Sequence, residues 1–94
     1  MRFEWNQDKN ILNLLKHGVV FEESMSVFDD GFALIIEDRA HSSFERREII
    51  VGQSSENRLL YVVFSERGNG IRIISARKLT SAERRRYEKG KFDG

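Results

Sequence analysis

The chain has 94 residues, 39% of them hydrophobic and 33% charged, and its length leaves room for one domain, 1–94. Because it has no cysteine, it can form no disulfide, no thiolate zinc site and no cysteine nucleophile. Its net charge is +1, but residues 1–70 carry −4 and residues 71–94 carry +5. The basic C-terminal quarter therefore suits the binding of a polyanion such as nucleic acid, or of an acidic protein partner. The longest apolar run, 59–64, is too short for a membrane span, and the N-terminus has no signal-peptide pattern. We expect a cytoplasmic protein that does not bind membranes.

The first predicted elements are a short strand and two helices. Apolar and polar residues alternate over 3–5, which predicts a strand. Asn6 is a good cap for a helix over 7–17, where apolar residues recur at three- and four-residue spacing before Gly18. A similar spacing predicts a second helix over roughly 21–28.

The rest of the chain predicts a sheet and a final helix. Strands are expected at 32–36, 47–52, 58–65 and 71–77. The last three strands form an antiparallel meander, and a tight hairpin at 67–70 joins the last two of them. The run 59–64 is apolar on both faces, so we expect a cover on each side, one of them the two helices. Thr80 and Glu83 form a capping box that starts a short last helix. The predicted helices and the antiparallel strands together indicate the α+β fold class.

The chemistry-bearing residues of this sequence are mainly basic. It has no phosphate-binding glycine loop, no metal-spaced His/Cys set and no Gly-x-Ser-x-Gly elbow. A candidate anion surface consists of Arg67, Arg72, Arg77, Lys78, Arg84, Arg85 and Arg86. By period two, Arg77 shares a face with Ile71, Ile73 and Ser75, at the end of a buried row. It either contacts an RNA phosphate or pairs with Glu83 or another carboxylate to anchor the last helix.

Four other residues also allow two interpretations. His17 is a candidate general base, but its place in the last turn of a helix equally suits an interaction with the helix dipole. His41, in the exposed connection 37–45, is either catalytic or solvated. Tyr87 either stacks on an RNA base or pins the last helix to the sheet. Arg67, at the hairpin tip, either binds RNA or is solvated.

Several segments, in order, resemble the BrnT family of ribonuclease toxins: 3–5, 13–23, 71–77 and 80–88. The resemblance implies a RelE-like fold, cleavage of RNA that stops translation and growth, and neutralisation by a small ribbon-helix-helix antitoxin. Such an antitoxin would be the only link to DNA, and we expect its acidic segments to cover the basic strand and helix. One departure is Val20, where such sequences often have a small polar residue that could cap the second helix.

We therefore expect a metal-independent endoribonuclease without cofactors, in which arginines stabilise the charge that develops when a ribose 2′-hydroxyl attacks the adjacent phosphate. The expected catalytic residues are Arg67, Arg77, His17 and Glu83, and the expected RNA-binding residues are Lys16, Arg72, Arg84, Arg85 and Tyr87. The alternative is a non-catalytic module that uses the basic C-terminal strand and helix as a docking surface for RNA or protein.

Overall fold

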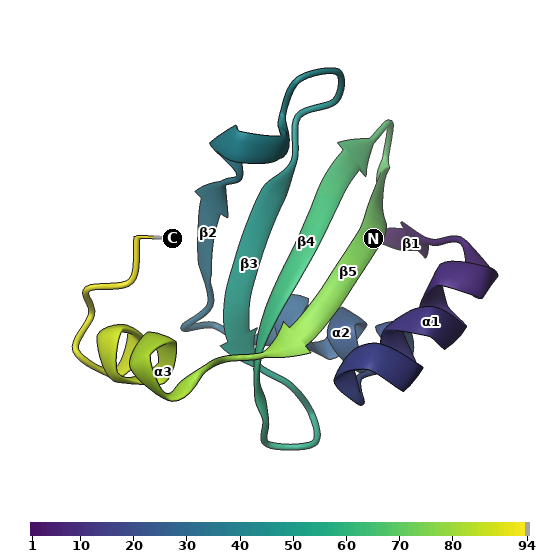
Figure 1. Ribbon diagram of the computed structural model, residues 1–94. Coiled ribbons are helices and arrows are strands. Elements are labelled where there is room, and N and C mark those ends of the chain that lie inside the picture. The colour runs from purple at the N-terminus through teal and green to yellow at the C-terminus, as the bar shows by residue number, and fades with distance from the viewer. Residues whose placement is uncertain (94) are drawn as a thin grey trace.

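A five-stranded mixed sheet forms the centre of the computed structural model, which describes residues 1–93 (Figure 1). The strand order is β1-β5-β4-β3-β2, with β1 parallel to β5 and the other pairs antiparallel. The elements are β1 (Arg2–Glu4), α1 (Gln7–His17), α2 (Phe21–Met25), β2 (Leu34–Glu37), β3 (Glu48–Gln53), β4 (Leu59–Arg67), β5 (Gly70–Lys78) and α3 (Ser81–Glu88). The predicted α+β class is confirmed.

The predicted end of the second helix and the predicted start of the strand after it are wrong. The second helix does not continue to residue 28, because α2 ends at Met25 and the chain tightens into a 3-10 turn over Ser26–Asp29. The next strand begins at Leu34 rather than at residue 32. Asp30 explains this delay: its Oδ1 accepts the backbone N–H of Phe32 at 3.0 Å, which holds the chain in a turn before β2.

Helix α1 docks through two asparagines rather than through its leucines. Asn13 Oδ1 accepts the Ala76 N–H at 3.1 Å, and Asn13 Nδ2 donates to the Ala76 carbonyl at 2.8 Å. Strand β1 pairs with the edge of β5 only at Gly70–Arg72. Further along this edge, the side-chain amide of Asn13 takes the place of a neighbouring strand by bonding both backbone groups of Ala76. Asn10 Oδ1 accepts the N–H of Phe21 at 2.8 Å, so Asn10 supplies the helix cap that Val20 does not provide.

The two faces of the sheet have different covers. On one face, Phe21 and Val27 pack with Leu60, Phe64 and other buried residues of the strands. The expected cover is therefore built by α2 and the 3-10 turn, with β1, while the leucines of α1 stay outside it. On the opposite face, Ile49, Val51 and Tyr61 pack against Phe92 of the C-terminal segment and Tyr87 of α3.

A β-bulge changes which side chains of β5 share a face. Phe64 pairs with Ile73, but the preceding residue of β4, Val63, pairs with Ser75, which leaves Ile74 as an extra residue. Beyond the bulge, Ala76 rather than Arg77 joins Ile71 and Ile73 in the core. The prediction that Arg77 shares a face with Ile71 and Ile73 is wrong for this reason.

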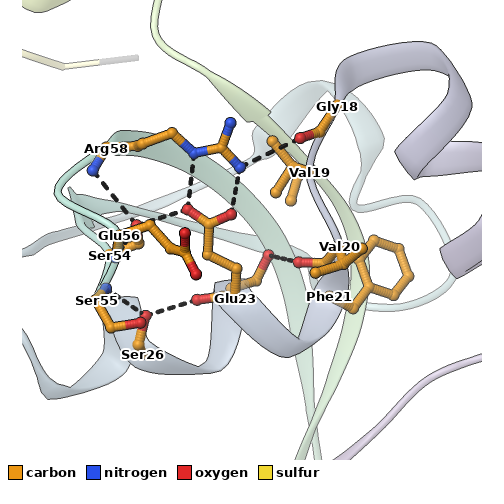
Figure 2. A network of polar contacts seen from close by, with 12 residues as sticks. Gly18, Val19, Val20, Phe21, Glu23, Ser26, Ser54, Ser55, Glu56 and Arg58 are labelled. Atoms are coloured by element: carbon orange, nitrogen blue, oxygen red, sulfur yellow. Dashed lines mark hydrogen bonds and ion pairs between the residues drawn. The ribbon is translucent and has the colours of Figure 1, made fainter.

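A partly buried ion pair ties α2 to the residue that precedes β4 (Figure 2). The Glu23 carboxylate accepts hydrogen bonds from two nitrogens of Arg58, with Arg58 Nε at 2.9 Å, and from Ser54 Oγ at 2.6 Å. Arg58 Nη2 also donates to the carbonyl of Gly18 at 3.2 Å. These bonds, chiefly those from Arg58, hold the pKa of Glu23 below its usual value. The pair joins the end of α1, α2 and the start of β4, so its role is structural.

Candidate nucleic-acid interface

Arg77 and Glu83, both predicted as catalytic, form a pair with each other. Arg77 Nη1 and Nη2 lie 2.8 and 3.0 Å from the two oxygens of Glu83, and the guanidinium carbon lies 4.0 Å above the ring of Tyr61. Glu83 also accepts the Thr80 N–H at 2.9 Å, which completes the predicted capping box. Arg77 above all, with Thr80, lowers the pKa of Glu83 to about 2. The geometry corresponds to the anchoring alternative considered for Arg77.

The other predicted residues near α3 face solvent or hold the helix. Arg84 is exposed and pairs with Glu88 at 3.4 Å, and Arg85 is exposed. Tyr87 donates its hydroxyl hydrogen to the carbonyl of Phe32 at 3.1 Å and packs with Ile49, Val51 and Phe92 on the sheet, which corresponds to the pinning interpretation. This group does not meet Arg72, because Arg77 is five residues further along β5, about 16 Å at the rise of an extended strand.

The two predicted residues on α1 also lie apart from the hairpin. Lys16 is exposed in the last turn and His17 is partly buried beside it. Both are basic residues at the C-terminal end of a helix that Gly18 closes with a φ of 70°, so they complement the helix dipole. The predicted site residues therefore fall into three groups: Arg67 with Arg72, those near α3, and those at the end of α1.

Arg67 and Arg72 come together in a cleft of about 200 Å³, which we call the cationic pocket. It is lined by Asn6, Lys9, Glu45, Arg47, Arg67, Arg72, Ile73 and Ile74. The sheet register explains the convergence: Arg72 pairs with Ser65, and Arg67 follows Ser65 by two residues on the same face. Arg47 precedes β3, and Lys9 lies in the first turn of α1, so four segments contribute cations.

One carboxylate lies among these four cations. Glu45 accepts a hydrogen bond from Arg67 Nη2 at 2.9 Å. The neighbouring Ser65 hydroxyl and then Arg67 hold the pKa of Glu45 below its usual value, and Arg47 adds to the effect. Ser65 is fully buried and makes no hydrogen bond of good geometry to the described residues, although its hydroxyl lies close to Glu45. Arg72 has no ion-pair partner in residues 1–93, so the pocket keeps an excess of positive charge.

Three charged members of the cationic pocket were not predicted as site residues: Lys9, Glu45 and Arg47. Glu45 ends the segment 37–45, which was expected to be an exposed connection, and Arg47 was predicted only as the first residue of a strand. Period two from the buried Ile49 would have placed Arg47 on the face of β3 that also carries Val51. No pattern in the sequence indicated that Lys9 lies beside this face.

His41 lies in a different cleft. Its Nδ1 is 3.1 Å from Asp38 Oδ2, and both residues line the cleft with Tyr61 and Asp93. The described residues contain no group of three or more His, Cys, Asp or Glu that could hold a metal ion. None of the helices over residues 1–93 is long and apolar enough to cross a membrane.

Comparison with known proteins identifies the family. The family model described as "Ribonuclease toxin, BrnT, of type II toxin-antitoxin system" matches residues 5–83. The crystal structure of the Brucella abortus ribonuclease toxin BrnT superposes with a TM-score of 0.67 at 20% sequence identity, covering 86% of this chain and 99% of that one. No curated protein sequence matches. The family-model match covers most of the chain, and the structural likeness supports the same fold. The chain therefore belongs to the BrnT family of ribonuclease toxins of type II toxin–antitoxin systems.

Proposed function

We propose that this chain is a cytoplasmic endoribonuclease that cleaves RNA without a metal ion, thereby stops translation and growth, and is neutralised by a ribbon-helix-helix antitoxin. The cationic pocket carries this proposal, because it brings Lys9, Arg47, Arg67 and Arg72 around a space of about 200 Å³, which is large enough to hold a phosphate group. Family membership supports the ribonuclease activity and the presence of an antitoxin.

In the proposed reaction, the ribose 2′-oxygen attacks the adjacent phosphorus and the bond from phosphorus to the 5′-oxygen breaks. The products are a 2′,3′-cyclic phosphate and a 5′-hydroxyl, and the proton lost by the 2′-hydroxyl is balanced by one gained by the leaving oxygen. Charge builds up on the phosphate oxygens in the transition state. Arginine guanidiniums bind such oxygens in bidentate fashion, and cations already in place stabilise this charge without reorganisation.

Glu45 is the group in the pocket that would accept the proton of the 2′-hydroxyl. Like any carboxyl group whose pKa is at or below its usual value, Glu45 is ionised at neutral pH and can accept a proton. Its lowered pKa makes it a weak base, since proton-transfer catalysis is most effective when the pKa is near the operating pH. The arginines must therefore supply most of the acceleration. The proposal retains Arg67 and Arg72 and assigns Arg77 and Glu83 to anchoring α3.

The test is cleavage of end-labelled single-stranded RNA by the purified chain in the presence of EDTA. Arg47→Ala and Arg72→Ala should each lower kcat/KM by about 100-fold or more, the usual effect of removing one preorganised charge-stabilising donor. Arg46→Ala is the matched control, because Arg46 is adjacent in sequence but does not line the cationic pocket. A 2′,3′-cyclic phosphate should appear at the cut end.

Two results would contradict the proposal. Cleavage that EDTA abolishes and a divalent cation restores would disprove metal independence. Intact RNA that still binds, with a salt dependence near a slope of about −3 for four phosphate contacts on a single strand, would favour the non-catalytic binding module.

A further inference from the structure

The outer face of α1 is apolar and uncovered. Because Asn10 and Asn13 face the protein, the large side chains on the other side of the helix point away from the core. Ile11, Leu12, Leu14 and Leu15 are 52%, 63%, 45% and 78% exposed. They are neighbours at three- and four-residue spacing on the helix, so they form one continuous apolar patch, and such patches are more often functional than scattered single apolar residues.

Positive charge borders this apolar face on one side, and Asp8, which is exposed one turn before Ile11 and Leu12, lies at the N-terminal end of the face. Lys9 and Lys16 are two turns apart and lie along the same edge of the helix, whereas the uncharged Gln7 and the apolar Leu14 lie along the other edge. The matching surface is an amphipathic helix that has apolar residues on one face and Asp or Glu along one flank.

A second copy of this chain fits the face less well. An antiparallel two-fold pairing of α1 with itself would bring the lysine edges together and place Lys9 beside Lys16 of the other copy, with like charges adjacent. This repulsion favours a different, acidic protein as the partner.

We propose that the outer face of α1 binds an acidic amphipathic helix of the antitoxin. The proposal rests on the family's toxin–antitoxin character and not on which residues cut RNA. It differs from the sequence-based expectation that the antitoxin covers the C-terminal strand and helix.

The same surface explains how docking could block the cationic pocket. Lys9 belongs both to the lysine edge of α1 and to the lining of the pocket. An antitoxin carboxylate that pairs with Lys9 removes one of the four cations and places a negative group where the RNA phosphate would enter. Binding and inhibition are therefore coupled through one side chain.

The test titrates the chain with the purified antitoxin encoded beside it, using isothermal calorimetry. The double variant Leu12→Gln/Leu15→Gln replaces the two most exposed leucines of the patch with glutamine, which is polar and has a high helix propensity. This variant should weaken antitoxin binding by about 30-fold or more. Ile35→Gln on β2, which is 55% exposed in the parent, is the matched control and should bind within about threefold of the parent. Circular dichroism and RNA cleavage without antitoxin should not change in either variant.

Each outcome decides the proposal. Unchanged affinity of the double variant would overturn it. A parent chain that is dimeric by light scattering, and that the double variant makes monomeric, would show that a second copy occupies the face instead. A parent chain that binds antitoxin but cuts no RNA would refute the proposed function, and the titration would still decide whether the antitoxin docks on α1.

Discussion

Replacing Glu83 with Gln removes the charge that holds Arg77 and keeps the size of the side chain. The pKa of Glu83 falls from 4.5 to about 2 in the folded protein. At about 1.4 kcal/mol for each tenfold change in proton affinity, this corresponds to an upper bound of about 3 kcal/mol. Arg77 is 33% exposed and regains some hydration when it loses its partner. We therefore expect Glu83→Gln to lower the free energy of unfolding at pH 7 by about 2 kcal/mol.

The pH dependence gives the sign of the effect. A folded-state pKa below the unfolded value stabilises the protein above pH 4.5, and this contribution disappears as the pH falls from 4.5 toward 2. We expect urea unfolding to show that the free energy of unfolding of the parent falls by more than that of Glu83→Gln between pH 7 and pH 2, because the variant lacks this contribution at every pH. The difference between the two proteins should close near pH 2.

The control for this experiment is Glu88→Gln. Glu88 pairs with Arg84 on the surface, where the two side chains are 57% and 63% exposed, so its loss should change the free energy of unfolding by less than about 0.5 kcal/mol. A Glu83→Gln effect equally small, or one that is the same at pH 2 and pH 7, would refute the anchoring role. A large loss of RNA cleavage in folded Glu83→Gln would restore the catalytic role first expected for it.

Two further substitutions test the packing. Asn13→Ala leaves both backbone groups of Ala76 without their side-chain partner and should cost about 3 kcal/mol in urea unfolding; unchanged hydrogen exchange at the Ala76 amide would contradict this. Gly52→Ala places a Cβ 2.8 Å from Cβ of Ala33 and 2.9 Å from Oδ2 of Asp30, so it should cost about 1–3 kcal/mol; a melting temperature equal to the parent's would show that this packing is looser than the structure indicates.

The sequence determined the kind and order of the elements. The ends of α1 and the start of α3 follow from local signals that need no distant partner: Asn6 accepts the Lys9 N–H, Gly18 adopts a left-handed backbone, and Thr80 forms its capping box with Glu83. Alternation at 3–5 and the β-rich apolar runs between turn residues likewise located each strand to within a few residues. These features depend on neighbours in the chain, and such neighbours can be read directly from the sequence.

Tertiary structure decided which faces meet. Leucine spacing predicted α1, but it could not tell that Asn13 would face inward, since that depends on the open edge of β5 some sixty residues later. The same limit applies to Arg77, whose face depends on a bulge at Ile74 that appears only when β5 pairs with β4. The cationic pocket needs Lys9, Glu45 and the hairpin arginines to converge from separate segments. Periodicity and capping are local, whereas register, bulges and hydrogen bonds between distant segments are fixed only when the whole chain packs.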